Sequence, residues 1–157
     1  MAENHRTRII AARPQEIWDV LADFGAISSW ADNADHSCIL FSGPDGGPVG
    51  TARRVQIKRA ALVERITEFD PPRALAYDIE GLPRRVLRVT NRWTLAAAPK
   101  DGVGSTVVTL TSTVEIGLEN HHSPPEKLAE RVLCRFLARQ SDSMLAGLAN
   151  RLENARV

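Results

Sequence analysis

The chain has 157 residues and a formal net charge of +1, with 43% apolar and 25% charged residues. This composition is typical of one globular domain, so we treat residues 1–157 as a single domain. The balanced charge provides no field that would attract nucleic acid, and no apolar run approaches the ~20 residues that cross a bilayer. Cys38 and Cys134 are isolated in a chain that needs no disulfide, so we expect reduced thiols and a cytoplasmic protein.

The first elements predicted are a strand over His5 to Ala12 and a helix that begins at Pro14, a residue suited to a first helical turn. Gly25 should end this helix, and a second short helix is expected over Ala26 to Trp30. The first helix has an apolar stripe at i, i+3, i+4 and i+7, formed by Ile17, Val20, Leu21 and Phe24.

The middle of the chain predicts consecutive strands that are separated only by turn signals. Such strands pair antiparallel, because parallel pairing needs a long crossover. The turn signals are Asp70-Pro-Pro72, Gly81-Leu-Pro83 and Lys100-Asp-Gly102. The predicted strands cover Ser37 to Phe41, Gly50 to Lys58, Leu62 to Phe69, Leu75 to Ile79, Val86 to Leu95 and Thr106 to Ile116.

A long helix is predicted from about Pro125 to Asn154, with Ser123 as its cap. At ~1.5 Å per residue it would span roughly 40 Å, enough to cross a small sheet. We therefore expect an α+β fold in which a curved antiparallel sheet of about seven strands wraps round this helix. Such a layout can enclose a cavity, which favours a small-ligand receptor or a cavity enzyme. The apolar stripe of the helix consists of Leu128, Val132, Leu133, Phe136, Leu137, Met144, Leu145, Leu148 and Leu152.

Several short motifs resemble the START/Bet v 1-like (SRPBCC) superfamily, and more narrowly its polyketide cyclase/dehydrase-like branch. The opening match is Pro14-x-x-Ile-Trp18-x-x-Leu21-x-Asp23-Phe24 followed by Trp30. The resemblance implies a helix-grip fold with two short helices after the first strand. It also implies a carrier of lipids, hormones or polyketides, or a cyclase. Further matches are Gly50-x-x-Arg53, Glu64-Arg65-Ile66, Leu75-x-Tyr77-x-Ile79-x-Gly81 and Trp93-x-Leu95.

Arg53 and Glu64 are the main candidate catalytic residues, together with Tyr77. Alternation places Arg53 with Val55, and Glu64 with Leu62, Ile66 and Glu68, on faces that would point into the cavity. Arg53 could anchor a carboxylate, enolate or phenolate oxygen, while Glu64 orients it or acts as a general base. The alternatives are a structural ion pair, or strand faces assigned the wrong way round.

The other candidate ligand-binding residues come from the sheet and from the last helix. Tyr77 and Asn91 could donate hydrogen bonds to a polar ligand atom, or they could satisfy nearby backbone groups. Gln140 interrupts the helical stripe and could present its amide to the cavity, whereas core packing would explain the apolar members equally well. The lining predicted beside these residues and Arg53 and Glu64 is Trp30, Val55, Ile79, Trp93, Leu133, Phe136, Leu137 and Met144.

No metal or cofactor is expected, because the adjacent His121 and His122 point in different directions on most backbones and have no ligand cluster nearby. Three functions remain. The first is binding of a small hydrophobic molecule, such as a lipid, isoprenoid or aromatic polyketide. The second is a cyclase or dehydratase that acts on a polyketide-like substrate, and the third is a protein-interaction module. Both a monomer and a homodimer fit the sequence.

Overall fold

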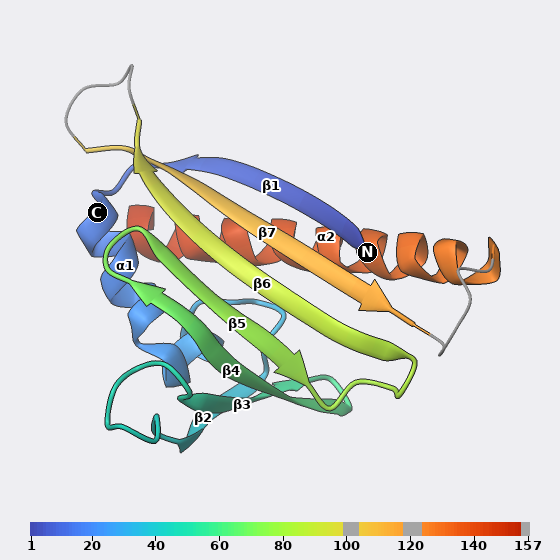
Figure 1. The fold of residues 1–157 in the computed structure, drawn as a ribbon. Coiled ribbons are helices and arrows are strands. Elements are labelled where there is room, and N and C mark those ends of the chain that lie inside the picture. The colour runs from blue at the N-terminus through green and yellow to red at the C-terminus, as the bar shows by residue number, and fades with distance from the viewer. Residues whose placement is uncertain (99–103, 118–123, 155–157) are drawn as a thin grey trace.

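The computed structural model describes residues 1–98, 104–117 and 124–154, in which helices lie on the inner face of a curved sheet (Figure 1). The sheet has the strand order β1-β7-β6-β5-β4-β3-β2, with every neighbouring pair antiparallel. This confirms the predicted α+β helix-grip architecture. The strands are β1 (Ala2–Ile10), β2 (His36–Phe41), β3 (Ala52–Ile57), β4 (Ala60–Asp70), β5 (Ala74–Glu80), β6 (Val86–Ala97) and β7 (Thr106–Ile116).

Within the described residues, three helical segments pack on the inner face of the sheet: α1 (Pro14–Ala22), the 3-10 helix η1 (Phe24–Ser29) and α2 (Pro124–Asn154). Gly25 lies inside η1, so the second short helix begins earlier than the sequence predicted. The predicted turn at Lys100-Asp-Gly102, the cap Ser123 and the pair His121-His122 lie outside the described residues. No helix in the described ranges combines the length and the apolarity that crossing a membrane requires.

Trp18 attaches α1 to the sheet. Its ring meets the ring of Phe69 edge to face, with centroids 5.0 Å apart. Alternation had placed Glu68, not Phe69, on the inner face, and this expectation was wrong. The register between β4 and β5 shifts between Ile66 and Glu68. A bulge moves the following side chains to the opposite face, so Phe69 turns inward and Glu68 binds Arg92 outside, with Nε and Oε2 2.8 Å apart.

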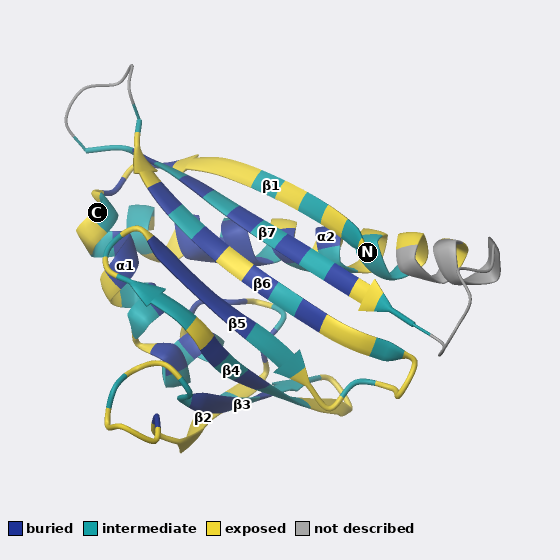
Figure 2. Cartoon of the chain, viewed as in Figure 1, coloured by how far each residue is buried: buried dark blue, intermediate teal, exposed yellow. Residues whose placement is uncertain are grey.

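The two ends of the inner face differ in how completely they are covered (Figure 2). At the end that carries α1, η1 and the second half of α2, apolar side chains such as Ile17, Leu75, Leu110 and Leu148 are fully buried. We call this the closed end. At the other end, where β3 and β5 finish, several inner-face side chains are only half-buried, although Val89 of β6 and Val114 of β7 are buried there too. We call this the open end, and its half-buried apolar residues are Ile57, Leu62, Ile79, Leu133 and Leu137.

At the closed end, the backbone of α2 lies close to the backbone of Trp30. A Cβ atom at Gly147 of α2 would overlap the carbonyl oxygen of Trp30, so only glycine fits this contact. The helix α2 also packs against β1 and β7. The first half of α2 extends beyond this tight contact (Figure 1). The fold therefore provides a solid core at one end and a less covered apolar surface at the other.

Candidate functional site

A line of buried polar side chains crosses the inner face between the closed end and the open end. Each of the strands β3 to β7 and the helix α2 supplies one member, in positions where apolar neighbours would otherwise be expected. We call this line the polar row. Its members are Arg53, Glu64, Tyr77, Asn91, Ser112 and Ser141.

Arg53 and Glu64 form an ion pair at the β3–β4 end of the polar row. The two residues are direct cross-strand partners. Nε and Nη2 of Arg53 each lie 2.8 Å from Oε1 of Glu64, and the two side chains are only 3% and 8% exposed. A buried charge is unfavourable unless it is paired and hydrogen-bonded, and this pair meets both conditions.

The guanidinium of Arg53 is held on its remaining sides by aromatic rings and backbone. Nη1 donates a hydrogen bond of 2.8 Å to the carbonyl oxygen of Phe24. The guanidinium carbon lies 3.7 Å from the ring centre of Phe24 and 4.7 Å from that of Tyr77, both cation–π distances. Arg53 is therefore fixed in one place, and it ties η1 and β5 to β3.

Tyr77 joins the ion pair to the rest of the polar row. Its hydroxyl oxygen accepts hydrogen bonds of 3.4 Å from Nδ2 of Asn91 and from Nε1 of Trp93. Ser112 donates to Oδ1 of Asn91 at 2.7 Å, and its hydroxyl lies 3.3 Å from that of Ser141. The polar row thus runs through the five strands β3 to β7 and reaches α2.

Complete burial raises the pKa of the Tyr77 hydroxyl, and the nearby negative charge of Glu64 raises it further, partly offset by Arg53. The phenol therefore keeps its proton at neutral pH. Within the described ranges, the structure shows no acceptor for this proton. Tyr77 is consequently equipped to donate a hydrogen bond to a carbonyl or hydroxyl oxygen, and it is not suited to act as a base.

The structure brings five of the predicted site residues together: Arg53, Glu64, Tyr77, Asn91 and Trp93. Trp30 joins them through an edge-to-face contact with Trp93, at a centroid distance of 5.9 Å. Val55 and Met144 are buried in the core, whereas Ile79, Leu133 and Leu137 belong to the open end.

Two predicted helix residues lie apart from the polar row. Phe136 is 54% exposed. Gln140 is one turn further along α2, and its Oε1 accepts a hydrogen bond of 2.7 Å from Asn33. A ligand-binding role for each predicted residue stays a prediction.

Sequence reasoning missed Phe24, Ser112 and Ser141. Ser112 alternates with Leu110 and Val114 on the inner face of β7, so its polar side chain in an apolar set was the available signal. Phe24 gave no signal, because it contributes a backbone oxygen and a ring face. Within the ranges that the structure describes, no three His, Cys, Asp or Glu side chains cluster as metal ligands would.

The fold of this chain is similar to the folds of several solved structures. A START superfamily protein from Mycobacterium smegmatis superimposes with a TM-score of 0.73 at 15% identity, over 98% of both chains. The Zhui aromatase/cyclase from Streptomyces sp. R1128 gives 0.77 at 20% identity, over 99% of this chain and 96% of that one. The di-domain ARO/CYC StfQ of the steffimycin biosynthetic pathway gives 0.75 at 12% identity, over 98% of this chain and 51% of that one.

The sequence then gives the family. Residues 1–153 match the family model described as "Polyketide cyclase / dehydrase and lipid transport", so the chain belongs to that family. A search of curated proteins finds no significant match. The structural likenesses, at these low identities, establish the helix-grip fold alone.

Proposed function

We propose that the open end binds a small apolar molecule and that the polar row contacts a polar atom of this ligand. The observation that carries the proposal is the group of half-buried apolar side chains at the open end, which adjoins the buried polar row. Apolar surface that is left partly exposed gains ~25 cal/mol per Å² when a ligand covers it. Binding sites for small molecules commonly combine such a lining with a few convergent polar groups.

The helix contributes to this lining through one face. Ser141 contacts Ser112 on the inner face of the sheet. Because residues at four-residue spacing share a helix face, Leu137 and Leu133 continue this face toward the open end. Ile79 adjoins the polar row from the sheet, since it is the cross-strand partner of Glu64. The open end therefore has apolar side chains on both the sheet and the helix.

The polar row defines the chemistry of the ligand's other end. The Tyr77 hydroxyl proton is available, so a carbonyl or phenol oxygen is the group that it would recognise. The family's description, which couples cyclases with lipid transport, is consistent with an apolar ligand of this kind. Cytoplasmic location and a monomeric or homodimeric state remain predictions.

The proposal is tested with the neutral, apolar probe N-phenyl-1-naphthylamine, whose fluorescence rises in apolar surroundings. We expect saturable binding by the purified protein. Ile79→Asn and Leu137→Trp should each weaken it about tenfold, the first by adding a polar group and the second by filling space. Ile9→Asn is the matched control, because Ile9 is an exposed apolar residue of β1 outside the open end.

Thermal unfolding of each variant separates lost binding from lost folding. Wild-type affinity in folded Ile79→Asn and Leu137→Trp proteins would overturn the proposal. So would an equal loss of affinity in Ile9→Asn.

A cyclase or dehydratase acting on a polyketide-like substrate is the second candidate. The available Tyr77 proton beside the Arg53–Glu64 pair favours it, because a fixed donor can stabilise the oxyanion that forms during an aldol-type closure. We expect Tyr77→Phe to abolish turnover of a poly-β-ketone thioester while the apolar probe still binds. Unchanged turnover would remove this candidate. In the described ranges, no observation favours the protein-interaction module.

A further inference from the structure

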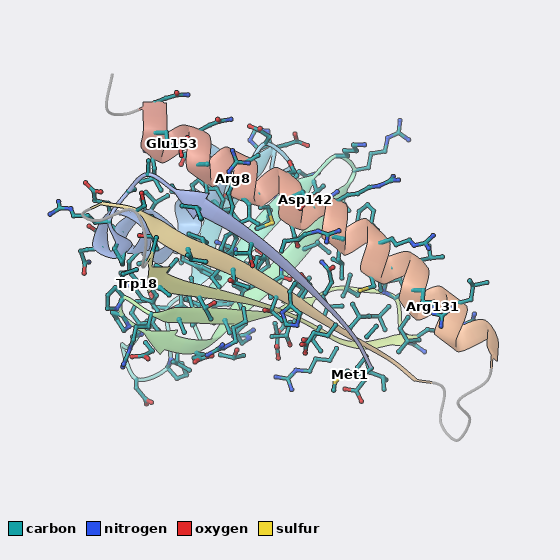
Figure 3. All side chains as sticks on the ribbon, turned by 90° about the horizontal axis from the view of Figure 1, so that it is seen from above. Met1, Arg8, Trp18, Arg131, Asp142 and Glu153 are labelled. Carbon is teal, nitrogen blue, oxygen red and sulfur yellow. The ribbon has the colours of Figure 1, made fainter. Side chains whose placement is uncertain are left out.

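A pocket of about 530 Å³ lies between the start of β1 and the first half of α2. It is a different part of the molecule from the open end, and its size is that of a small-molecule site. Figure 3 shows the two walls diverging, with Met1 at the start of β1 and Arg131 on α2. The lining residues that matter here are Asn4, Arg6, Arg131, Cys134, Arg135 and Ala138.

Among the lining residues whose side chains the structure describes, positive charge exceeds negative charge. These are three arginines, Arg6, Arg131 and Arg135, and one acidic residue, Glu3. Two of these charges already have partners: Nε of Arg6 lies 3.1 Å from Oδ1 of Asp142, and Glu3 lies 2.7 Å from Nε2 of His5. Of the described lining residues, the two arginines of α2 are therefore the charges left without a partner.

Arg131 and Arg135 have no hydrogen bond or ion pair to any other described part of the chain. They are one helical turn apart, a spacing at which like charges repel each other and destabilise a helix. An anion placed between them would relieve this repulsion. Guanidinium groups also match the geometry of carboxylate and phosphate oxygens.

An unpartnered donor lies on the opposite wall. Nδ2 of Asn4 is buried and makes no hydrogen bond, although Asn4 lines the pocket. A buried donor without an acceptor is unfavourable, and native proteins seldom leave one. Asn4 is also the cross-strand partner of Ser112, so it extends the polar row onto β1.

From these observations we infer that the pocket binds a small organic anion, a carboxylate or a phosphate. Its oxygens accept hydrogen bonds from Arg131, Arg135 and the amide of Asn4. The apolar part of the ligand lies against Cys134 and Ala138. The inference does not rest on the proposed function, since a neutral ligand at the open end and an anion in this pocket use different side chains.

The two cysteines provide an internal test. Cys134 lines the pocket, whereas Cys38 is exposed on β2. We would treat the protein with the neutral reagent iodoacetamide and follow each cysteine by mass spectrometry. Hexanoate or inorganic phosphate, at up to about 10 mM, should slow alkylation of Cys134 about fivefold or more and leave Cys38 unchanged. An equal concentration of 1-hexanol should protect neither cysteine.

The double variant Arg131→Gln/Arg135→Gln should need about tenfold more anion for half-protection of Cys134. Half-protection concentrations are compared in place of rates, because arginines beside a thiol change its reactivity. Arg139→Gln is the matched control, an exposed arginine one turn further along the same helix that does not line the pocket. It should behave as the wild type does.

A second measurement covers an anion that binds without shielding the thiol. The side-chain amide signal of Asn4 in a ¹⁵N–¹H spectrum should shift on adding either anion. If neither anion protects Cys134 or shifts this signal, the inference is wrong. It is also wrong if the double variant responds as strongly as Arg139→Gln. In both cases the binding of N-phenyl-1-naphthylamine at the open end is unaffected, so the two proposals fail separately.

Discussion

The two halves of α2 have similar apolar patterns but different surroundings. In the second half, Met144, Leu145 and Leu148 are at most 6% exposed. In the first half, Leu128, Val132 and Phe136 are each more than half exposed. The second half is covered by the sheet, α1 and the backbone at Trp30, whereas the first half packs along β1 and β7 only in part. A stripe at helical spacing therefore shows that a helix forms, and what covers the stripe depends on the rest of the fold.

The largest expected loss of stability is at the polar row, which lies between the closed end and the open end of the inner face. Glu64→Gln leaves the buried Arg53 without its counter-charge, and loss of one partner of a buried pair costs about 3–5 kcal/mol. Urea unfolding measures this loss. Glu68→Gln is the control, because it breaks a pair with Arg92 on the outer face and should cost about 1 kcal/mol or less. Equal losses would mean that the inner pair is no more critical than the outer one.

The next test compares one leucine from each half of α2. Leu148 is fully buried, so Leu148→Ala should leave a cavity and lower the free energy of unfolding by about 3 kcal/mol. Leu128 is 64% exposed, and Leu128→Ala should change it by about 0.5 kcal/mol at most. The same urea titration serves for both. A large loss for Leu128→Ala would show that the first half is covered in solution, contrary to the comparison.

At Gly147, the sign of the stability change on substitution by alanine tests how closely α2 approaches Trp30. In an exposed helix, replacing glycine by alanine stabilises by about 1 kcal/mol. Here the added methyl group would overlap the Trp30 carbonyl oxygen, so Gly147→Ala should destabilise by about 1–3 kcal/mol. Thermal unfolding distinguishes the two results. A stabilised variant would show that α2 does not approach Trp30 closely.

The smallest expected effect is the pH dependence of stability that arises from Tyr77. Burial raises the pKa of Tyr77, so the unfolded chain loses this proton near pH 10 while the folded chain retains it. The contribution of Tyr77 to the free energy of unfolding is therefore fully present below pH 10. It is lost as the pH rises above 10, by up to ~1.4 kcal/mol per pH unit. Tyr77 is the chain's single tyrosine, so the rise in phenolate absorbance at about 295 nm reports the titration of this residue alone.

Tyr77→Phe provides the comparison for this last prediction, because it removes the titrating group and leaves the other alkaline groups in place. Its stability should fall less steeply above pH 10 than that of the wild type. A phenol that titrates at its ordinary value in the folded protein would show that the polar row is open to water.

Much of the fold and part of the site could be predicted from the sequence. Alternation on consecutive strands correctly placed Arg53, Glu64, Tyr77 and Asn91 on the inner face, because the period of two is a direct consequence of strand geometry. The bulge between Ile66 and Glu68 was not predicted, because strict alternation was carried through it and only one apolar residue, Phe69, marks the shift in the pattern.

The site beside β1 was missed for a different reason. The first residues of β1, Ala2 to Asn4, are of types depleted in strands, so they gave no strand signal and the strand was expected to begin at His5. Pairing with β7 overrides this weak local preference. The opposing arginines lie on α2, and nothing in the sequence relates that distant segment to the start of the chain.

The placement of the tryptophans has a practical consequence for spectroscopy. Trp18, Trp30 and Trp93 are the chain's three indoles, and all are at most 6% exposed. Their emission should be that of a dry environment, and dissolved iodide should quench it poorly until the core itself opens. Fraying of the first turns of α2 would pass unseen in such an experiment. Conversely, a compound that binds beside the polar row should alter the emission of Trp93, whose N–H meets the Tyr77 oxygen.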